Sequence, residues 1–125
     1  MTTNIQLEEL AKKLNLNDFR GVFMADELKD MKPRENESAV VNTEDSRKNG
    51  KHWIAWYKNG DDKYFFDSYG SHIIPELKSY LGSPINCHNF QIQKFNDDIC
   101  GELSILFIYL MSRNIPYEDV ILSMI

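Results

Sequence analysis

The sequence predicts a mixed fold of helices and strands, with helices near both ends of the chain and strands in its middle. Three observations predict this arrangement: an N-terminal segment with amphipathic helical spacing, two central runs joined by an Asn-Gly turn signal, and a long apolar stretch in the last third. A chain of 125 residues can bury one core, so residues 1–125 are expected to form a single domain.

The first predicted helix rests on apolar residues that recur at i, i+3, i+4 and i+7, namely Leu7, Leu10, Ala11 and Leu14. Asn15 and Asn17 are expected to end it. A short apolar run follows at 19–28, and the mixed-charge residues 29–37 are expected at the surface. Residues 39–43 are rich in β-branched side chains, which is typical of a buried strand.

A hairpin is predicted next, from strands at 51–58 and 63–68 with Asn59-Gly60 as the turn. If these two residues form the turn, counting outward places His52 directly opposite Asp67 on the same face of the sheet. Their Cβ atoms would then be about 4.5–5.5 Å apart. At that separation a carboxylate can hold an imidazole.

The last elements are predicted from apolar spacing and from helix-stop signals. Residues 75–81 predict a short helix and residues 85–93 another strand. The stretch from about Cys100 to Arg113 leaves almost no polar face, so its helix should be buried on most sides. A terminal helix is expected to start at Pro116.

Charge and composition argue against several classes of protein. The net charge of −5 argues against nucleic-acid binding, and the longest apolar stretch, 103–111, is too short to span a bilayer. No signal peptide is evident, so Cys87 and Cys100 are expected as reduced thiols in an intracellular compartment, with Cys87 in the core. The cysteines and histidines lack zinc-ligand spacing, so no metal is expected. No cofactor is expected either. The protein is expected to be a monomer.

Four residues in chain order supply the groups for acyl transfer through a thioester. His52 would be the general base, Asp67 its orienter, Gln93 an oxyanion donor and Cys100 the nucleophile. The start of a buried helix favours the thiolate form of Cys100. Papain-like enzymes place the cysteine before the histidine, so this order indicates another lineage.

The neighbours of these residues suggest further roles. Gln93 is preferred as the oxyanion donor because it is closer to the helix start, while Gln91 on the same strand face stays an alternative. Gly101 would let substrate approach the backbone. Trp53 would shelter the imidazole and contact substrate, whereas Trp56 is expected to pack in the core.

Several of these segments resemble the adenovirus protease, adenain. Residues 39–43 followed by His52-Trp53 resemble the strand that leads to its catalytic histidine. Residues 66–70 resemble its acid-bearing strand, with aspartate as in the related proteases of Polinton (Maverick) elements and virophages. Gln93 with Cys100-Gly101 matches the adenain spacing, and the resemblance covers residues 21–113.

The resemblance implies an adenain-like α+β cysteine protease fold of the ubiquitin-like-protease clan, with a central mixed sheet and the nucleophile at the N-terminus of a buried helix. It implies cleavage of viral capsid and core precursors during virion maturation, in the virion and in the host nucleus or cytoplasm. Adenain is activated by DNA and by a disulfide-linked peptide. This chain is acidic, which argues against DNA as an activator, and Cys87 does not map onto the position that bonds the peptide.

Two other functions stay open at this point. One is a protease for ubiquitin-like modifiers, which has the same residue order but needs a wide surface for the modifier and a tunnel for its Gly-Gly tail. The lack of obvious insertions argues mildly against it. The other is a non-catalytic interaction module that kept the fold, against which the presence of all four site residues argues.

Overall fold

The computed structural model describes residues 2–44, 52–92 and 98–125. In chain order the elements are α1 (Asn4–Lys13), β1 (Phe19–Met24), the 3₁₀ helix η1 (Ala25–Asp30), β2 (Asn36–Asn42), β3 (Trp53–Asn59), β4 (Asp62–Phe66), α2 (Pro75–Leu81), α3 (Cys100–Ser112) and α4 (Tyr117–Met124). Among these described residues, no helix is long and apolar enough to cross a bilayer.

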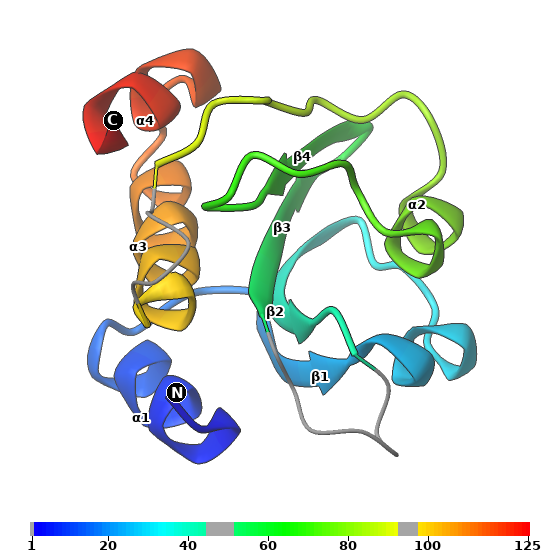
Figure 1. Ribbon diagram of the computed structural model, residues 1–125. Coiled ribbons are helices and arrows are strands. Elements are labelled where there is room, and N and C mark those ends of the chain that lie inside the picture. The colour runs from blue at the N-terminus through cyan, green and yellow to red at the C-terminus, as the bar shows by residue number, and fades with distance from the viewer. Residues whose placement is uncertain (1, 45–51, 93–97) are drawn as a thin grey trace.

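The four strands form one mixed sheet in the order β1-β2-β3-β4. β1 pairs with β2 in parallel, and the other two pairings are antiparallel. α1, α3 and α4 pack on one face of the sheet, and η1 and α2 pack on the other (Figure 1). The predicted α+β class with a central mixed sheet is confirmed.

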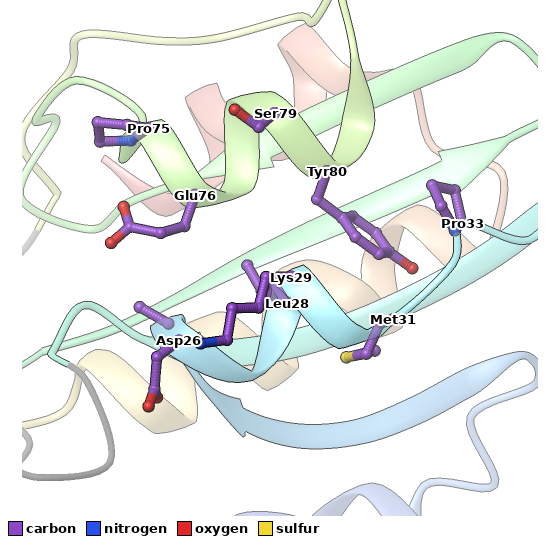
Figure 2. A pocket seen from close by; sticks show the side chains of 10 residues that line it. Asp26, Leu28, Lys29, Met31, Pro33, Pro75, Glu76, Ser79 and Tyr80 are labelled. Carbon is purple, nitrogen blue, oxygen red and sulfur yellow. The ribbon is translucent and has the colours of Figure 1, made fainter.

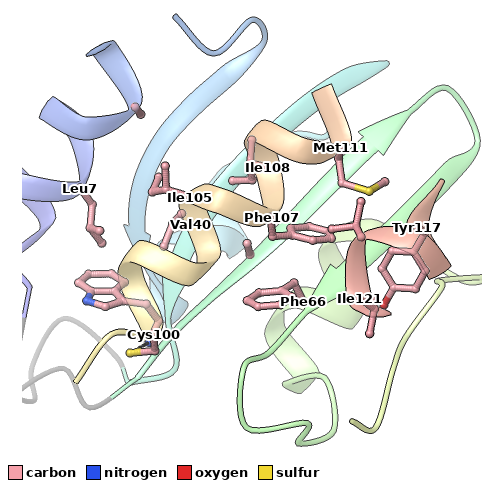
Figure 3. Close-up of a cluster of buried hydrophobic side chains, with 14 residues drawn as sticks. Leu7, Val40, Phe66, Cys100, Ile105, Phe107, Ile108, Met111, Tyr117 and Ile121 are labelled. Atoms are coloured by element: carbon pink, nitrogen blue, oxygen red, sulfur yellow. Dashed lines mark hydrogen bonds between the residues drawn. The ribbon is translucent and has the colours of Figure 1, made fainter. Parts of the chain in front are cut away.

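The core lies on both faces because side chains alternate along each strand. Toward α3 the strands contribute Val40, Ala55 and Phe66, and the Phe66 ring stacks on Phe107 with centroids 4.9 Å apart (Figure 3). Toward α2 they contribute a second cluster, in which Trp56 is fully buried as predicted. α3 therefore packs against the sheet, and its first residue, Cys100, lies beside Trp53 at the start of β3.

The hairpin has a different register from the predicted one. Lys58 pairs with Lys63 and Asn59 with Asp62, so the turn residues are Gly60 and Asp61. Gly60 has a φ of +60°, which glycine adopts without strain, and this places it at the first turn position. A shift by two residues keeps every side chain on its original face. Asp67 is therefore one diagonal step from His52 rather than directly opposite.

The predicted strand at 85–93 is wrong for its described part, up to residue 92. There only an isolated bridge forms, between Tyr64 and Asn86. Beyond this bridge the segment stays close to the residues that follow β4: His88 accepts from the Asp67 N–H at 3.2 Å, and the Ile92 N–H donates to the Ser68 carbonyl at 2.8 Å. Cys87 lies on this segment and is exposed, so its expected core position is wrong too.

Candidate active site

His52 and Asp67 lie side by side at one end of the sheet. His52 directly precedes β3 and Asp67 directly follows β4, so the antiparallel pairing brings them together. The His52 Nε2–H donates to the Asp67 Oδ1 at 2.5 Å. Both residues are buried, with exposed fractions of 8% and 3%. The predicted proximity is confirmed, although the predicted register is wrong.

Further hydrogen bonds hold both the backbone and the carboxylate of Asp67. Its Oδ1 also accepts from the Tyr69 N–H at 2.8 Å, and its carbonyl accepts from the Gly70 N–H at 2.8 Å. Its own N–H donates to His88 Nε2 at 3.2 Å. Gly70 has a φ of +70°, and a Cβ there would lie 2.9 Å from the Phe90 carbonyl oxygen. The turn after Asp67 is thus fixed by the segment that covers it.

Tyr69 stacks on the imidazole of His52. The ring centroids are 4.2 Å apart and the planes differ by 10°. The observed register explains this contact, because counting outward from the pair Ala55–Phe66 places Tyr69 opposite His52. Tyr69, rather than the predicted Trp53, covers a face of the imidazole.

Cys100 is the first residue of α3 and is 4% exposed. Its Sγ accepts a hydrogen bond from the Trp53 N–H at 3.4 Å. Because Trp53 directly follows His52, this bond holds the sulfur beside the histidine's own strand. Ile99, at the N-cap, makes no side-chain cap, so Cys100 lies at the uncapped start of the helix.

Ser104 ties the first turn of α3 to β3. Its hydroxyl donates to the Cys100 carbonyl at 2.8 Å and lies 3.3 Å from the Trp53 carbonyl. Ser104 is fully buried, so its hydroxyl depends on these two carbonyl oxygens rather than on water for hydrogen bonding. The backbones on both sides of the sulfur are therefore joined by the Trp53–Cys100 bond and by Ser104.

The charge state of His52 follows from its neighbours. Burial alone lowers its pKa, but the interactions with Asp67 and Cys100 outweigh burial and raise the pKa from 6.5 to about 9. Nε2 is engaged by Asp67. Nδ1 is buried and makes no hydrogen bond with any of the described residues. Because Nε2 is bonded to Asp67, Nδ1 is the ring nitrogen that this carboxylate does not occupy.

Gly101 and Trp53 have packing roles in this structure. A Cβ on Gly101 would lie 2.8 Å from Leu7 Cδ2 and 3.1 Å from Trp53 Cδ1, so a side chain there would force Leu7 or Trp53 to move. The Trp53 Nε1–H donates to the Thr2 carbonyl at 3.0 Å. Trp53 also lines a hollow of about 380 Å³ together with Thr2, Phe23 and Asn42. Substrate contact by either residue stays a prediction.

The predicted oxyanion donor, Gln93, lies outside the described residues. The alternative, Gln91, is exposed on the segment that covers the Asp67 turn. Cys100 itself supplies one backbone N–H at the start of α3. The choice between the two glutamines stays a prediction.

Within the described part of the chain, no group of three His, Cys, Asp or Glu side chains could hold a metal ion. A hollow of about 710 Å³ lies between η1 and α2, lined by Leu28, Pro75 and Tyr80 among others (Figure 2). It is on the sheet face away from α3, and His52, Asp67 and Cys100 do not line it.

Sequence reasoning missed three residues that hold the site. Tyr69 follows from the correct hairpin register. Ser104 lies four residues after Cys100 and therefore on the same helix face, a spacing that could have indicated it. His88 has no such signal, because it reaches Asp67 from a segment without regular structure.

Comparison with known proteins identifies the fold. No protein-family model and no curated protein matches the sequence. The crystal structure of the ASFV pS273R protease matches with a TM-score of 0.70 and 19% identity, over 98% of this chain and 61% of that one. Its selenomethionine form matches with a TM-score of 0.70 and 18% identity, over 100% of this chain and 63% of that one.

These matches define a class of fold: a protease fold with a mixed sheet and, in this chain, a cysteine at the start of a buried helix. The particular fold is that of the ASFV pS273R protease. This chain spans about three fifths of the length of that protease.

Proposed function

We propose that the protein is a cysteine endopeptidase that cleaves precursor proteins of a virus or virus-like element during virion maturation. The observation that carries this proposal is the His52–Asp67 hydrogen bond of 2.5 Å beside a cysteine at a helix start. The protease fold supports it independently. The adenain-like character and the maturation role rest on the sequence resemblance.

Acylation would begin from a Cys100 thiolate and a His52 imidazolium. The sulfur attacks the scissile carbonyl carbon, and the carbonyl π electrons move to the oxygen. As the tetrahedral intermediate collapses, the C–N bond breaks and His52 Nδ1 gives its proton to the leaving amine. The acyl group is then held on Cys100 as a thioester. Asp67 stabilises the imidazolium and keeps its ring oriented throughout.

Deacylation would use His52 in the opposite direction. The now neutral Nδ1 takes a proton from a water molecule as the water oxygen attacks the thioester carbonyl carbon. Collapse of the second tetrahedral intermediate releases the acid and restores the thiolate–imidazolium pair. The Cys100 N–H and the Gln93 side chain would donate to the oxyanion in both steps, with Gln91 as the alternative donor.

The substrates in this proposal are polypeptides, and the reaction needs no metal or organic cofactor. DNA is not proposed as an activator, because the net charge of −5 disfavours binding to phosphate backbones. Both thiols are free, which fits a reducing compartment of the host cell or a virion assembled there.

Cleavage of a mixed library of unstructured peptides, read by mass spectrometry, tests the proposal. We expect new termini with the wild-type chain and none with Cys100→Ala. Acid quenching should trap an acyl adduct on Cys100 that hydroxylamine removes, since thioesters are cleaved by hydroxylamine. Equal cleavage by both chains, or none by either under a range of conditions, would refute the proposal.

The same chain tests the modifier-protease alternative. Vinyl-sulfone derivatives of ubiquitin and SUMO label a cysteine only when the modifier is seated on the enzyme. We expect no labelling of Cys100 by either probe at concentrations at which peptides are cleaved. Fast labelling together with poor peptide cleavage would favour a protease for modifiers instead.

A further inference from the structure

His88 contacts the backbone of Asp67 from outside the sheet. Within the described sheet β4 is an edge strand, so the N–H and C=O groups on its outer side need partners other than a strand. The His88 Nε2 accepts the hydrogen bond of the Asp67 N–H at 3.2 Å. An imidazole therefore satisfies the backbone of the residue that orients the proposed general base.

Three different groups hydrogen-bond to the outward-facing backbone of β4 and of the residue that follows it, one after another along the chain. The Asn86 backbone donates to the Lys63 carbonyl at 2.8 Å and accepts from the Phe65 N–H at 2.9 Å. The Tyr117 hydroxyl, from α4, then donates to the Phe65 carbonyl at 2.7 Å. His88 makes the last of these edge bonds, at the point where the chain leaves the sheet.

Packing fixes the ring of His88 in this position. Its centroid is 5.5 Å from the Phe66 ring and 6.5 Å from the Tyr117 ring, which meets it edge-on. Accepting at Nε2 requires a neutral ring with its proton on Nδ1. Burial lowers the pKa of His88, and although the nearby Asp67 charge and the Phe90 backbone act in the opposite direction, the net shift is downward.

We propose that His88 is a positioning residue for Asp67: it holds the aspartate backbone so that the carboxylate meets His52. Its consequence for catalysis rests on the proposed function. The two histidines contact the same aspartate in different ways, His52 at the carboxylate and His88 at the peptide N–H. Without the His88 acceptor, the Asp67 N–H loses its partner at the sheet edge. The Tyr69 and Gly70 N–H groups are then left to hold the aspartate, and its carboxylate shifts relative to His52.

Three variants separate positioning from packing. His88→Phe keeps an aromatic ring but has no acceptor, whereas His88→Gln keeps an acceptor oxygen. Cys87→Ser is the matched control, because Cys87 lines the same hollow of about 560 Å³ as His88 and has no bond to Asp67. We expect His88→Phe to lower kcat roughly tenfold to a hundredfold, as for a misplaced catalytic group, with KM nearly unchanged. His88→Gln should recover part of the loss, and Cys87→Ser should match wild type.

NMR gives a readout that does not depend on proteolysis. In the wild-type chain at neutral pH, we expect His88 to be neutral with its proton on Nδ1. We expect the pKa of His52, measured by titration, to be lower in His88→Phe than in wild type and to return toward wild type in His88→Gln. The tautomer measurement needs no variant, so it decides the matter even if His88→Phe does not fold.

The proposal is overturned if His88 carries a proton on Nε2 in the wild-type chain. It is also overturned if a folded His88→Phe leaves the His52 pKa and kcat unchanged, or if both variants lose activity equally with the His52 pKa unchanged, which would mean packing alone. A wild-type chain that cleaves no peptide would refute the proposed function. The His52 titration would still decide the role of His88.

Discussion

At the scale of single residues, the site depends on how firmly one imidazole is held. His52 is bonded to Asp67 at its edge and covered by Tyr69 on one face. Tyr69 acts twice, because its N–H donates to the same carboxylate oxygen that binds His52. The hydrogen bond and the stacking contact together restrict rotation of the His52 ring, which keeps the proposed base in one orientation.

Replacing Tyr69 tests the stacking contact. Aromatic pairs contribute about 0.5–1.5 kcal/mol, so Tyr69→Leu should lower kcat/KM by roughly threefold to tenfold. Tyr69→Phe keeps the ring and the backbone N–H and should stay near the wild-type value. Peptide-cleavage rates of the two variants check this. Equal losses in both would assign the effect to the hydroxyl and not to stacking.

At the scale of the elements, the start of α3 is the junction that places the sulfur. α1 packs against it through Leu7, and β3 packs against it through Trp53, both at Gly101. The hydroxyl of Ser104 joins the backbones of α3 and β3 one turn further along. The nucleophile is thus fixed by close packing of three elements rather than by its own side-chain contacts alone.

Gly101→Ala should disturb this junction. The added methyl group meets the buried Leu7 and Trp53 side chains, and such overpacking costs about 1–3 kcal/mol of the free energy of unfolding. Urea denaturation measures it. The double variant Gly101→Ala/Leu7→Ala should lose less unfolding free energy than the two single variants lose in total, because the smaller side chain at position 7 relieves the contact. Fully additive losses would contradict this explanation.

Much of this element structure could be predicted from the sequence, and the failures have physical causes. The helix at Cys100–Ser112 follows from an apolar pattern that only a buried helix satisfies. The face shared by His52 and Asp67 could be predicted because side chains alternate with a period of two, even though the turn position was wrong. The course of residues 85–92 could not be predicted, since their few backbone bonds to Lys63, Phe65 and Ser68 depend on the finished sheet edge.

At the scale of the whole molecule, the sheet gathers residues that are far apart in sequence at one end. The α3 face supplies Cys100, the strand ends supply His52 and Asp67, and the segment at the outer edge supplies His88. Because the pKa of the buried His52 is raised at this junction, the stability of the fold is linked to pH.

This linkage has a definite sign. The pKa of His52 is raised in the folded chain from 6.5 to about 9, so its stabilising contribution is complete below pH 6.5 and is lost as pH rises through about 9. The difference in free energy of unfolding between wild type and Asp67→Asn should therefore shrink between pH 6.5 and 9. Urea denaturation at several pH values checks this. A constant difference would mean that His52 is not charged in the folded chain.

The central claim is that His52 activates Cys100, and the rate of alkylation by iodoacetamide at neutral pH tests it most directly. Cys87 is an internal reference: it is exposed, partial desolvation raises the pKa of its thiol, and it does not contact His52. Mass spectrometry of the labelled peptides should show Cys100 reacting faster than Cys87 in wild type, because the thiolate is the reactive form. His52→Ala should slow Cys100 and leave Cys87 unchanged. If Cys87 alone were labelled, or if His52→Ala left the Cys100 rate unchanged, the assignment of this site would be wrong.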